Sequence, residues 1–424
     1  IPGGSVVLRG GTAITMQGDR VIADADVVIT GNRIVAVGRR GSLTIPEGAA
    51  IRDVRGKYLL PGFIDVHDHW FDIRRGILER NDWDFLATLA YGVTSGLDPQ
   101  TFTTDIFAYQ DMIDAGLMVG PRAFSTGPGI FINSDITSVA HARDVMTRNR
   151  DYYRTRNVKS YLVGGRAQRQ MMIVASAELG MMPTTEGASD LMLNLTHAID
   201  GFAGNEHALP VAPIHDDVIQ LFARSGTAYN PTLIVLYGGA EMEHEQMGRH
   251  DMLGDAKLRR FIPQSVLEAK ARGHRATPDF DRAYPRFAHA ALEIQRAGGL
   301  VGLGAHGELP GLGYHWEMLA FASGGATPHE VLQAATIDGA RIIGRASDIG
   351  SIEAGKLADI LILDADPLAD IANIGSLVQV MKNGRIYDAD TLEEVYPRQR
   401  PLPPLWFTQD MPSVPALSTP ESAQ

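Results

Sequence analysis

The sequence predicts an α/β fold, namely a (β/α)8 TIM-like barrel with a small β-sandwich domain that both ends of the chain build. Apolar strand-like runs alternate with helical stretches from residue 58 to residue 345, which indicates a parallel sheet covered by helices. Residues 1–57 and 346–390 instead have the pattern of short strands separated by turns. A chain of 424 residues is too long for one small hydrophobic core. This length suits a barrel of roughly 250 residues with an accessory domain.

Eight short apolar runs are the predicted barrel strands. They are Ile64–Val66, Val93–Leu97, Ala123–Ser125, Ser160–Val163, Met181–Pro183, Gly201–Ala203, Tyr229–Val235 and Val301–Leu303. An open doubly wound sheet fits less well, because the sequence shows no glycine-rich dinucleotide-binding loop. The barrel is therefore the preferred prediction.

The flanking segments supply the predicted β domain. Its strands are Ser5–Arg9, Ala25–Thr30, Arg33–Val37, Asp359–Leu363, Val378–Lys382 and Arg385–Tyr387. Residues 391–424 form a Pro-rich tail, which we expect to be extended over a neighbour or partly disordered.

Composition excludes several classes of function. The 38 Lys and Arg residues face 50 Asp and Glu residues, and a net charge of −12 argues against nucleic acid and anionic membranes as partners. No apolar run reaches the roughly 18 residues of a membrane span. Cysteine is absent, so a bound metal must be held by histidine, carboxylate or modified lysine. The first residue is Ile1, which we interpret as a trimmed or processed chain or a domain of a longer one.

The most informative stretch is the predicted first barrel strand and the residues that follow it. Pro61-Gly62 leads into an apolar run that ends at His67 and His69. Side chains two residues apart in a strand point to the same side, so both imidazoles can converge on one ion. Neutral imidazole suits divalent transition metals. The spacing therefore predicts a metal site, against the alternative of two surface histidines in a turn.

Several motifs resemble the amidohydrolase superfamily of metal-dependent hydrolases, over about residues 5–390. They are PGFIDVHDH at residues 61–69, VKSYLVGGRAQRQ at 158–170, GNEHALPVAP at 204–213, LGAHGELPGLGYHWE at 303–317 and GSIEAGKLADI at 350–360. The chain looks most similar to the imidazolonepropionase-like and prolidase-like branch. More narrowly, it resembles amidohydrolase domains fused to TolB-type β-propellers, which implies a possible propeller domain on a longer chain.

The resemblance implies a set of metal ligands at the ends of strands 1, 4, 5, 6 and 8. The residues at those places are His67, His69, Lys159, Glu186, His207 and His306. Lys159 would have to be carboxylated, because an ammonium group has no lone pair. Glu186 stands where the family has a histidine, with His197 as a rival in a predicted helix. His306 stands where the family has an aspartate, with Glu308 as the second choice.

Other residues are candidates for supporting roles. Asp65, Asp68 and Glu206 could orient ligand histidines. Arg166 and Arg169 could bind a substrate carboxylate, or form a solvated basic loop. Tyr161 and Tyr229 could polarise a carbonyl or be core residues, and His315 and Trp316 could line the mouth of the site. Residues 236–285 are a predicted insertion, either a lid or a solvated helical hairpin, whose histidines His244, His250 and His274 are not expected to be ligands.

These expectations lead to a functional hypothesis. The chain would be a metal-dependent hydrolase of an amide or peptide C–N bond, in a dipeptide, an N-acyl amino acid or a cyclic amide, with His306 as proton acceptor. A lactone, ester or carbamate hydrolase is one alternative, and a non-catalytic scaffold is another.

One or two metal ions are expected, zinc first and Mn, Fe, Ni or Co otherwise. A mononuclear site at His67, His69 and His306 stays open. We expect a homo-oligomer acting on a small molecule with a free carboxylate. The TolB-fused relatives favour an extracytoplasmic or periplasmic location over a cytoplasmic one.

Overall fold

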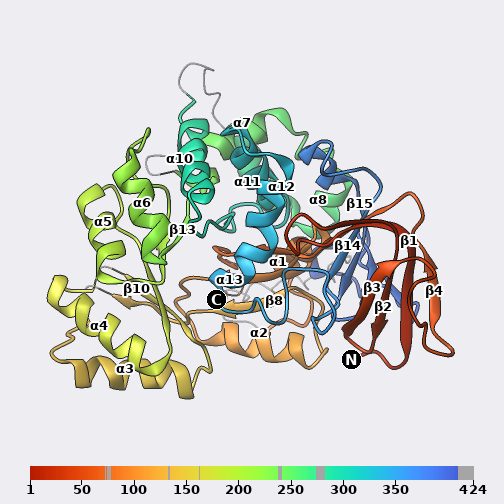
Figure 1. The fold of residues 1–424 in the computed structure, drawn as a ribbon, viewed down its shortest axis with the longest axis horizontal. Coiled ribbons are helices and arrows are strands. Elements are labelled where there is room, and N and C mark those ends of the chain that lie inside the picture. The colour runs from red at the N-terminus through yellow and green to blue at the C-terminus, as the bar shows by residue number, and fades with distance from the viewer. Residues whose placement is uncertain are drawn as a thin grey trace, which may run out of the picture.

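The computed structural model describes residues 1–71, 73, 78–131, 134–161, 163–236, 241–273 and 282–408. These residues form an α/β structure with three sheets, in which helices surround two parallel sheets and a third, larger sheet lies to one side (Figure 1). No described helix is both long and apolar enough to cross a membrane.

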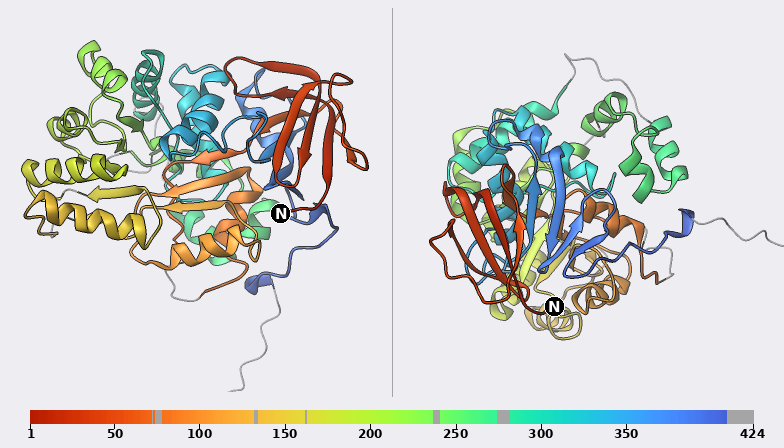
Figure 2. Two further views of the ribbon diagram at one scale, coloured as in Figure 1. Left: turned by 60° about the horizontal axis from the view of Figure 1, so that its bottom comes forward. Right: turned by 90° about the vertical axis from the view of Figure 1, so that its right-hand side faces the viewer.

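The largest sheet has nine strands and draws on both ends of the chain. Its strands are β1 (Ser5–Ile14), β2 (Val21–Thr30), β3 (Arg33–Arg39), β4 (Ala50–Asp53), β5 (Tyr58–Pro61), β14 (Ile360–Leu363), β15 (Leu377–Lys382), β16 (Arg385–Asp388) and β17 (Glu394–Tyr396). Their order is β17-β16-β15-β14-β5-β1-β2-β3, with β4 paired to β1. Figure 2 shows the red N-terminal strands beside the blue C-terminal ones.

The two chain ends meet where β14 pairs antiparallel with β5, with Leu361 opposite Leu60. Hydrogen bonds join these strands into one nine-stranded sheet, to which both ends of the chain contribute. The predicted tail begins too early, since Glu394–Tyr396 pairs with β16. Residues 409–424 of that tail lie outside the described residues.

Two parallel sheets make up the middle of the chain. One contains β6 (Phe63–Asp65), β7 (Val93–Asp98) and β8 (Arg122–Ser125), and the other contains β9 (Ile130–Phe131), β10 (Asn157–Tyr161), β11 (Met182–Thr185), β12 (Gly204–Glu206) and β13 (Ala228–Asn230). Val301 forms an isolated parallel bridge with Tyr229, and Val66 N–H donates to Leu303 O at 3.0 Å. The predicted last strand, Val301–Leu303, therefore lies between β13 and the segment that follows β6.

Two predicted strands differ from those observed. The sixth was placed at Gly201–Ala203, but Gly201 adopts a left-handed conformation that ends a helix, and the strand begins at Gly204. The seventh was extended to Val235, but β13 ends at Asn230 and a 3-10 turn, η2, covers Leu233–Val235.

The helices follow the strands in sequence. They are α1 (Trp83–Ala90), α2 (Asp105–Asp114), α3 (Val139–Asp151), α4 (Arg166–Leu179), α5 (Leu191–Asp200), α6 (Asp216–Ser225), α7 (Glu241–Arg249), α8 (Ala256–Phe261), α9 (Gln264–Gly273), α10 (Tyr284–Arg296), α11 (Leu312–Ser323), α12 (Pro328–Gln333) and α13 (Gly339–Ile342). The turns η4 (Ala334–Asp338), η5 (Ile371–Ser376) and η6 (Trp406–Thr408) complete the assignment. Helices α7 to α9 lie in the predicted insertion, which is therefore helical.

Candidate metal centre

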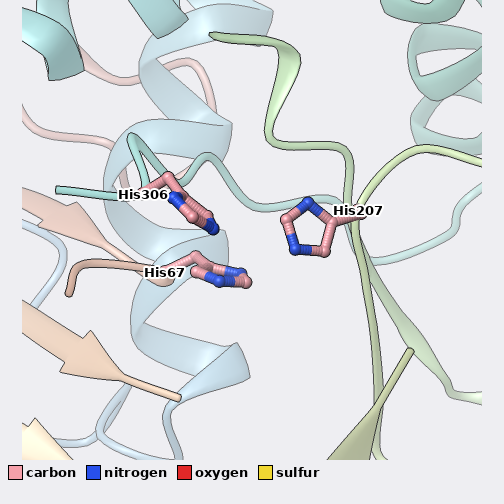
Figure 3. A group of neighbouring side chains, drawn as sticks. All are labelled: His67, His207 and His306. Atoms are coloured by element: carbon pink, nitrogen blue, oxygen red, sulfur yellow. The ribbon is translucent and has the colours of Figure 1, made fainter. Parts of the chain in front are cut away.

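Histidines from separate strand ends come together in one cluster. His67, His207 and His306 each offer a ring nitrogen, and these nitrogens lie within 4.8 Å of one another. Figure 3 shows the rings of His67 and His306 one above the other, with His207 facing them. His69 belongs to the same cluster, because its Nε2 is 3.2 Å from His67 Nε2. The structure thus brings together the four histidines that the sequence singled out as ligands.

The backbone explains how these side chains meet. His67 directly follows Val66 after β6, and His306 N–H donates to His67 O at 2.7 Å. Buried Asp65 accepts from the N–H groups of His67 and Ala305, at 2.9 and 3.2 Å, and so ties the two segments together. A Cβ at Gly304 would collide with the Cβ of His67, so this close approach requires glycine.

Two of the ligand candidates have backbone angles that are uncommon for residues other than glycine. His207 has φ of 67° and His306 has φ of 63°. This left-handed region costs on the order of 1–3 kcal/mol per residue and is concentrated at functional sites. In both cases the unusual backbone turns the imidazole toward the cluster.

Each of the four imidazoles is held at Nδ1 by an oxygen of another side chain. The pairs are His67 with Glu206 (2.9 Å), His69 with Asp98 (3.1 Å), His207 with Thr232 (2.6 Å) and His306 with Glu308 (3.2 Å). A carboxylate accepts a hydrogen bond from Nδ1–H, which keeps the proton on Nδ1 and leaves Nε2 with a free lone pair. In His67 and His69 these two lone pairs face each other across 3.2 Å. A shared cation resolves that repulsion, so the arrangement fits a divalent metal.

The charge states of the histidines point the same way. Burial lowers the pKa of His67 well below its ordinary value and also lowers the pKa of His69. Burial brings the pKa of His207 down to about 3. Neutral imidazoles are the form that binds metal, so the site is preorganised for ligation near neutral pH.

Lys159 and Glu186 form a buried ion pair beside the histidines. The Lys159 side chain is 2% exposed, and its Nζ lies 2.9 Å from Glu186 Oε2. The same oxygen is 3.5 Å from His207 Nε2. Burial acts to raise the pKa of Glu186, but the charges of Lys159 and His207 together with the hydrogen bonds from Lys159 and Tyr161 outweigh it, and the pKa falls to about 2. The Tyr161 hydroxyl also hydrogen-bonds Glu186, so Tyr161 lies at this end of the site.

Some orienting residues were missed or misassigned by the sequence. Asp98 and Thr232 were not considered, although Asp98 ends β7 and a polar residue at the carboxyl end of a parallel strand is a recognisable signal. Glu206 was paired with its neighbour His207, but it contacts His67, because adjacent side chains of a strand point to opposite faces. Asp65 binds backbone N–H groups rather than an imidazole.

Asp68, the other predicted orienting carboxylate, is buried. Burial raises its pKa well above the ordinary value, and the nearby charges of Asp65, Asp84 and Asp98 act in the same direction. A neutral carboxyl group is therefore favoured at this position.

Four candidates for substrate binding have other partners in the structure. Arg166 pairs with Asp200 at 2.7 Å, and Arg169 donates to Gly164 O at 3.0 Å. Tyr229 is buried, and its hydroxyl accepts from Leu209 N–H at 2.8 Å. His315 was expected in a loop but lies buried in α11, where its Nε2 contacts Tyr91 O at 2.7 Å. Of this group, Tyr161 has the contact with the cluster.

The remaining predicted side chains are placed as follows. Trp316 lies buried in α11 rather than at a loop surface. His197 is fully buried in α5 against Phe202, with a ring-centroid distance of 5.0 Å, and burial lowers its pKa to about 4. His250 Nε2 pairs with Asp255 at 2.8 Å, and His244 lies in α7. His274 lies outside the described residues.

The chain matches the amidohydrolase family over residues 197–387. This part of the chain belongs to the amidohydrolase family. The match includes His207 and His306 of the cluster as well as η4, α13 and β14. Amidohydrolases generally use divalent metals, and the histidine cluster is a possible metal site of that kind.

Curated relatives match shorter segments. A 5-methylthioadenosine/S-adenosylhomocysteine deaminase of Pelotomaculum thermopropionicum is 39% identical over 69 residues, which is 15% of this chain and 16% of that protein. An adenine deaminase of Mesorhizobium japonicum is 30% identical over 90 residues, 21% of this chain and 14% of the relative. The chain thus spans only about a sixth or less of the length of these amidohydrolase relatives.

Solved structures match almost the whole length of the chain. A Xaa-Pro dipeptidase with bound methionine has a TM-score of 0.68 at 19% identity, covering 91% of this chain and 100% of the other. A molinate hydrolase has a TM-score of 0.68 at 20% identity, covering 92% and 96%. Phenylurea hydrolase B has a TM-score of 0.67 at 19% identity, covering 91% and 97%. At these identities the likeness establishes a shared fold.

Proposed function

We propose that this amidohydrolase is a metal-dependent hydrolase that cleaves an amide-type C–N bond. The observation that carries the proposal is the pair of Nε2 atoms of His67 and His69, 3.2 Å apart with both Nδ1 atoms held by carboxylates. Family membership of residues 197–387 supports it, and so do the printed activities of the dipeptidase, molinate hydrolase and phenylurea hydrolase neighbours.

The proposed ligand set is the one expected from the sequence. It consists of His67, His69, Lys159, Glu186, His207 and His306. Divalent ions in such a site activate water and polarise a carbonyl oxygen, and zinc is the first choice for imidazole-rich ligation. Lys159 and Glu186 now neutralise each other. Carboxylation of Lys159 would replace that pair with two anions, which fits a site that holds two cations and not a site that holds one.

Proton transfer is assigned to the pair formed by His306 and Glu308. Glu308 Oε1 lies 3.2 Å from His306 Nδ1, so this carboxylate stabilises an imidazolium and fixes the ring orientation. His306 Nε2 would accept a proton during attack and return it to the leaving nitrogen if it does not ligate a metal, and Glu308 would take this role if His306 is a ligand. The proposed substrate is a dipeptide, an N-acyl amino acid or a cyclic amide with a free carboxylate. Tyr161, which contacts Glu186, is the proposed side chain for substrate contact.

We also infer a closed (β/α)8 barrel from the two parallel sheets. The bridge between Tyr229 and Val301, and the hydrogen bond from Val66 N–H to Leu303 O, support closure on one side. Thr101 and Pro128 form a parallel bridge that supports continuity on the other side. Residues 1–57 with 346–390 would then be the accessory domain. A homo-oligomer and a further propeller domain remain part of this proposal.

The test combines metal analysis with hydrolysis of a panel of dipeptides and N-acyl amino acids. The His67→Ala/His69→Ala variant should lose bound metal and turnover while keeping its circular dichroism spectrum, because these side chains lie at the strand ends and not in the core. The matched control, His141→Ala/His289→Ala, removes two histidines outside the cluster and should behave like wild type. Full turnover in the first variant would reject the proposal. Wild-type protein without tight metal, even after growth with added Zn or Mn, would favour the scaffold alternative.

A further inference from the structure

We propose that a second site, beside the amino-terminal ends of β10 and β11, binds a small phosphorylated molecule. The site is a cavity of about 390 Å³ whose lining includes Arg154, Arg156 and Arg345. Arg154 and Arg156 immediately precede β10, whereas Lys159 lies further along that strand on the way to the metal ligands. The cavity is thus separate from the cluster described above, and the inference does not depend on the proposed hydrolase activity.

The charge of this cavity is the first argument. None of its lining residues is acidic, although the chain as a whole carries a net charge of −12. Among the described residues, the three guanidinium groups make no ion pair or hydrogen bond. Other arginines nearby are neutralised: Arg143 pairs with Glu178. Three uncompensated cations around one cavity repel each other unless an anion joins them.

Side-chain positions in the cavity are partly fixed. The Thr155 hydroxyl is buried and donates to Ser125 O at 2.7 Å, which anchors the chain between Arg154 and Arg156. Arg154 has φ of 54°, a left-handed turn that places it apart from the extended strand that follows. The guanidinium carbon of Arg345 lies 4.9 Å from the centre of the Phe124 ring, a cation–π contact that holds its direction.

An amide side chain that lines the cavity is the second argument. Asn157 lines the cavity and is 8% exposed, yet its side chain makes no hydrogen bond within the described chain. Its position beside the arginines offers both a donor and an acceptor to a bound molecule.

These features select the class of ligand. Guanidinium groups recognise phosphate oxygens through paired hydrogen bonds, and several of them favour a dianion over a monocarboxylate. The volume lies in the range of small-molecule pockets, roughly 300–1,000 Å³, and exceeds what a bare ion requires. A phosphomonoester with a small polar body fits both the charge and the space, with Asn157 facing the body.

The experiment is isothermal titration of the purified chain in phosphate-free buffer, with glycerol 3-phosphate, inorganic phosphate and glycerol as probes. We expect saturable binding of the phosphomonoester, weaker binding of inorganic phosphate and none of glycerol. Added salt should weaken the affinity, because the cavity is reached by solvent ions. Saturable binding of inorganic phosphate with none of the ester would overturn the proposal in favour of a bare anion site.

Variants identify the site. Arg154→Ala/Arg345→Ala should lower the affinity at least tenfold, and Asn157→Ala should weaken the ester more than inorganic phosphate. If the double variant fails to fold, the single variant Arg345→Gln, which changes an exposed residue, takes its place in the binding test. The matched control Arg259→Ala/Arg286→Ala removes the same charge elsewhere and should bind like wild type, as should His67→Ala/His69→Ala. Equal affinity for the phosphomonoester in wild type and in the cavity variants would show that it does not bind in this cavity.

Discussion

Glu206 connects more groups at the centre than any other orienting side chain described above. It accepts a hydrogen bond from His67 Nδ1–H at 2.9 Å, one from Asn230 Nδ2 at 2.8 Å and one from the Thr184 hydroxyl. Burial raises its pKa, and these donors act against that rise. Glu206 therefore sets both the tautomer and the direction of His67.

Replacing Glu206 by glutamine should weaken the metal site without unfolding the chain. The amide keeps the size of the side chain but removes the charge that favours Nδ1–H on His67. We expect metal affinity to fall by roughly 10–100-fold, measured by competition with a chelator. The control Glu178→Gln alters an exposed carboxylate and should leave affinity unchanged. Wild-type affinity in Glu206→Gln would show that the carboxylate does not orient His67.

Glu186 and His197 can be separated by a second pair of variants. Glu186 lies 3.5 Å from His207 Nε2, whereas His197 is packed against Phe202 inside α5. Glu186→Ala should therefore strip metal and abolish turnover, and His197→Ala should leave the metal content intact. Metal analysis of both proteins decides between them. Loss of metal in His197→Ala alone would assign the strand 5 ligand to that histidine instead.

The sequence predicted the four histidines of the cluster better than the side chains that orient them. His67, His69, His207 and His306 each follow an apolar run or a motif, and parallel strands bring such ends together. Their oxygen partners come from other strands, such as Asp98 from β7 for His69. Cross-strand contacts of this kind depend on strand stagger, which a single sequence does not specify.

The helical insertion is joined to the metal centre by one lysine. Lys270 in α9 donates to Glu243 in α7 at 2.9 Å and to Glu308 at 2.7 Å, and Glu308 in turn contacts His306. Burial alone would lower the pKa of Lys270, but these two carboxylates outweigh it and raise the pKa. The insertion and the proposed proton acceptor thus share a charge network.

Lys270→Met should loosen that network. It leaves Glu243, which is 5% exposed, without a cation, and a buried acceptor without its partner costs about 1–3 kcal/mol. We expect faster hydrogen exchange in α7 and α9 and a lower kcat, because His306 loses the support that reaches it through Glu308. Lys57→Met, which removes one side of an exposed ion pair with Asp364, is the control. Unchanged exchange and unchanged kcat would show that the insertion is anchored elsewhere.

Strand existence was easier to predict than strand limits. Alternation of apolar runs with helical stretches identified most of the parallel strands, because burial of both sheet faces demands such runs. The sequence missed β9 (Ile130–Phe131) and placed the sixth strand just before β12. The errors arose at helix ends: Gly201 follows an amphipathic helix and was assigned to a strand, but its left-handed backbone caps α5. The Lys270 contacts were not predictable, since they join segments through side chains alone.

The large sheet is fastened to the parallel sheets by a buried polar group. Arg122 in β8 pairs with Asp359 and donates to Asn383 Oδ1 at 3.1 Å. Lys382, next in the chain, is buried nearby. Burial lowers the pKa of Lys382 to about 7, the Arg122 charge acts in the same direction, and Asp359 opposes both.

This lysine makes the stability of the whole molecule depend on pH. The unfolded chain holds the Lys382 proton up to a pKa of about 10.4, whereas the folded chain releases it near 7. Between these two pH values the unfolded state binds more protons than the folded state. The contribution of Lys382 to the free energy of unfolding therefore rises with pH across that window. Below pH 7 both states are protonated, and the cost of the buried charge is fully present.

Lys382→Met should remove that dependence. We expect the variant to be more stable at pH 7, by on the order of 2–4 kcal/mol, with the difference shrinking toward pH 10. Urea unfolding of both proteins at several pH values gives the comparison. Lys57→Met, which removes a partly exposed lysine paired with Asp364, controls for the general effect of removing a positive charge. A difference that does not change with pH would contradict the assignment.

The pairing of β5 with β14 has a consequence for the protein during its synthesis. On the ribosome, Tyr58–Pro61 emerges long before Ile360–Leu363, so the edge of β5 that receives β14 stays open while the intervening chain is synthesised. Such an edge is a template for pairing with other chains. Pairing of β5 with β14 is also slow, because the entropy cost of closing the long intervening loop is incurred before the contact forms. Nascent chains that stop before residue 360 should therefore aggregate or engage chaperones, whereas release of the last strands should end that exposure.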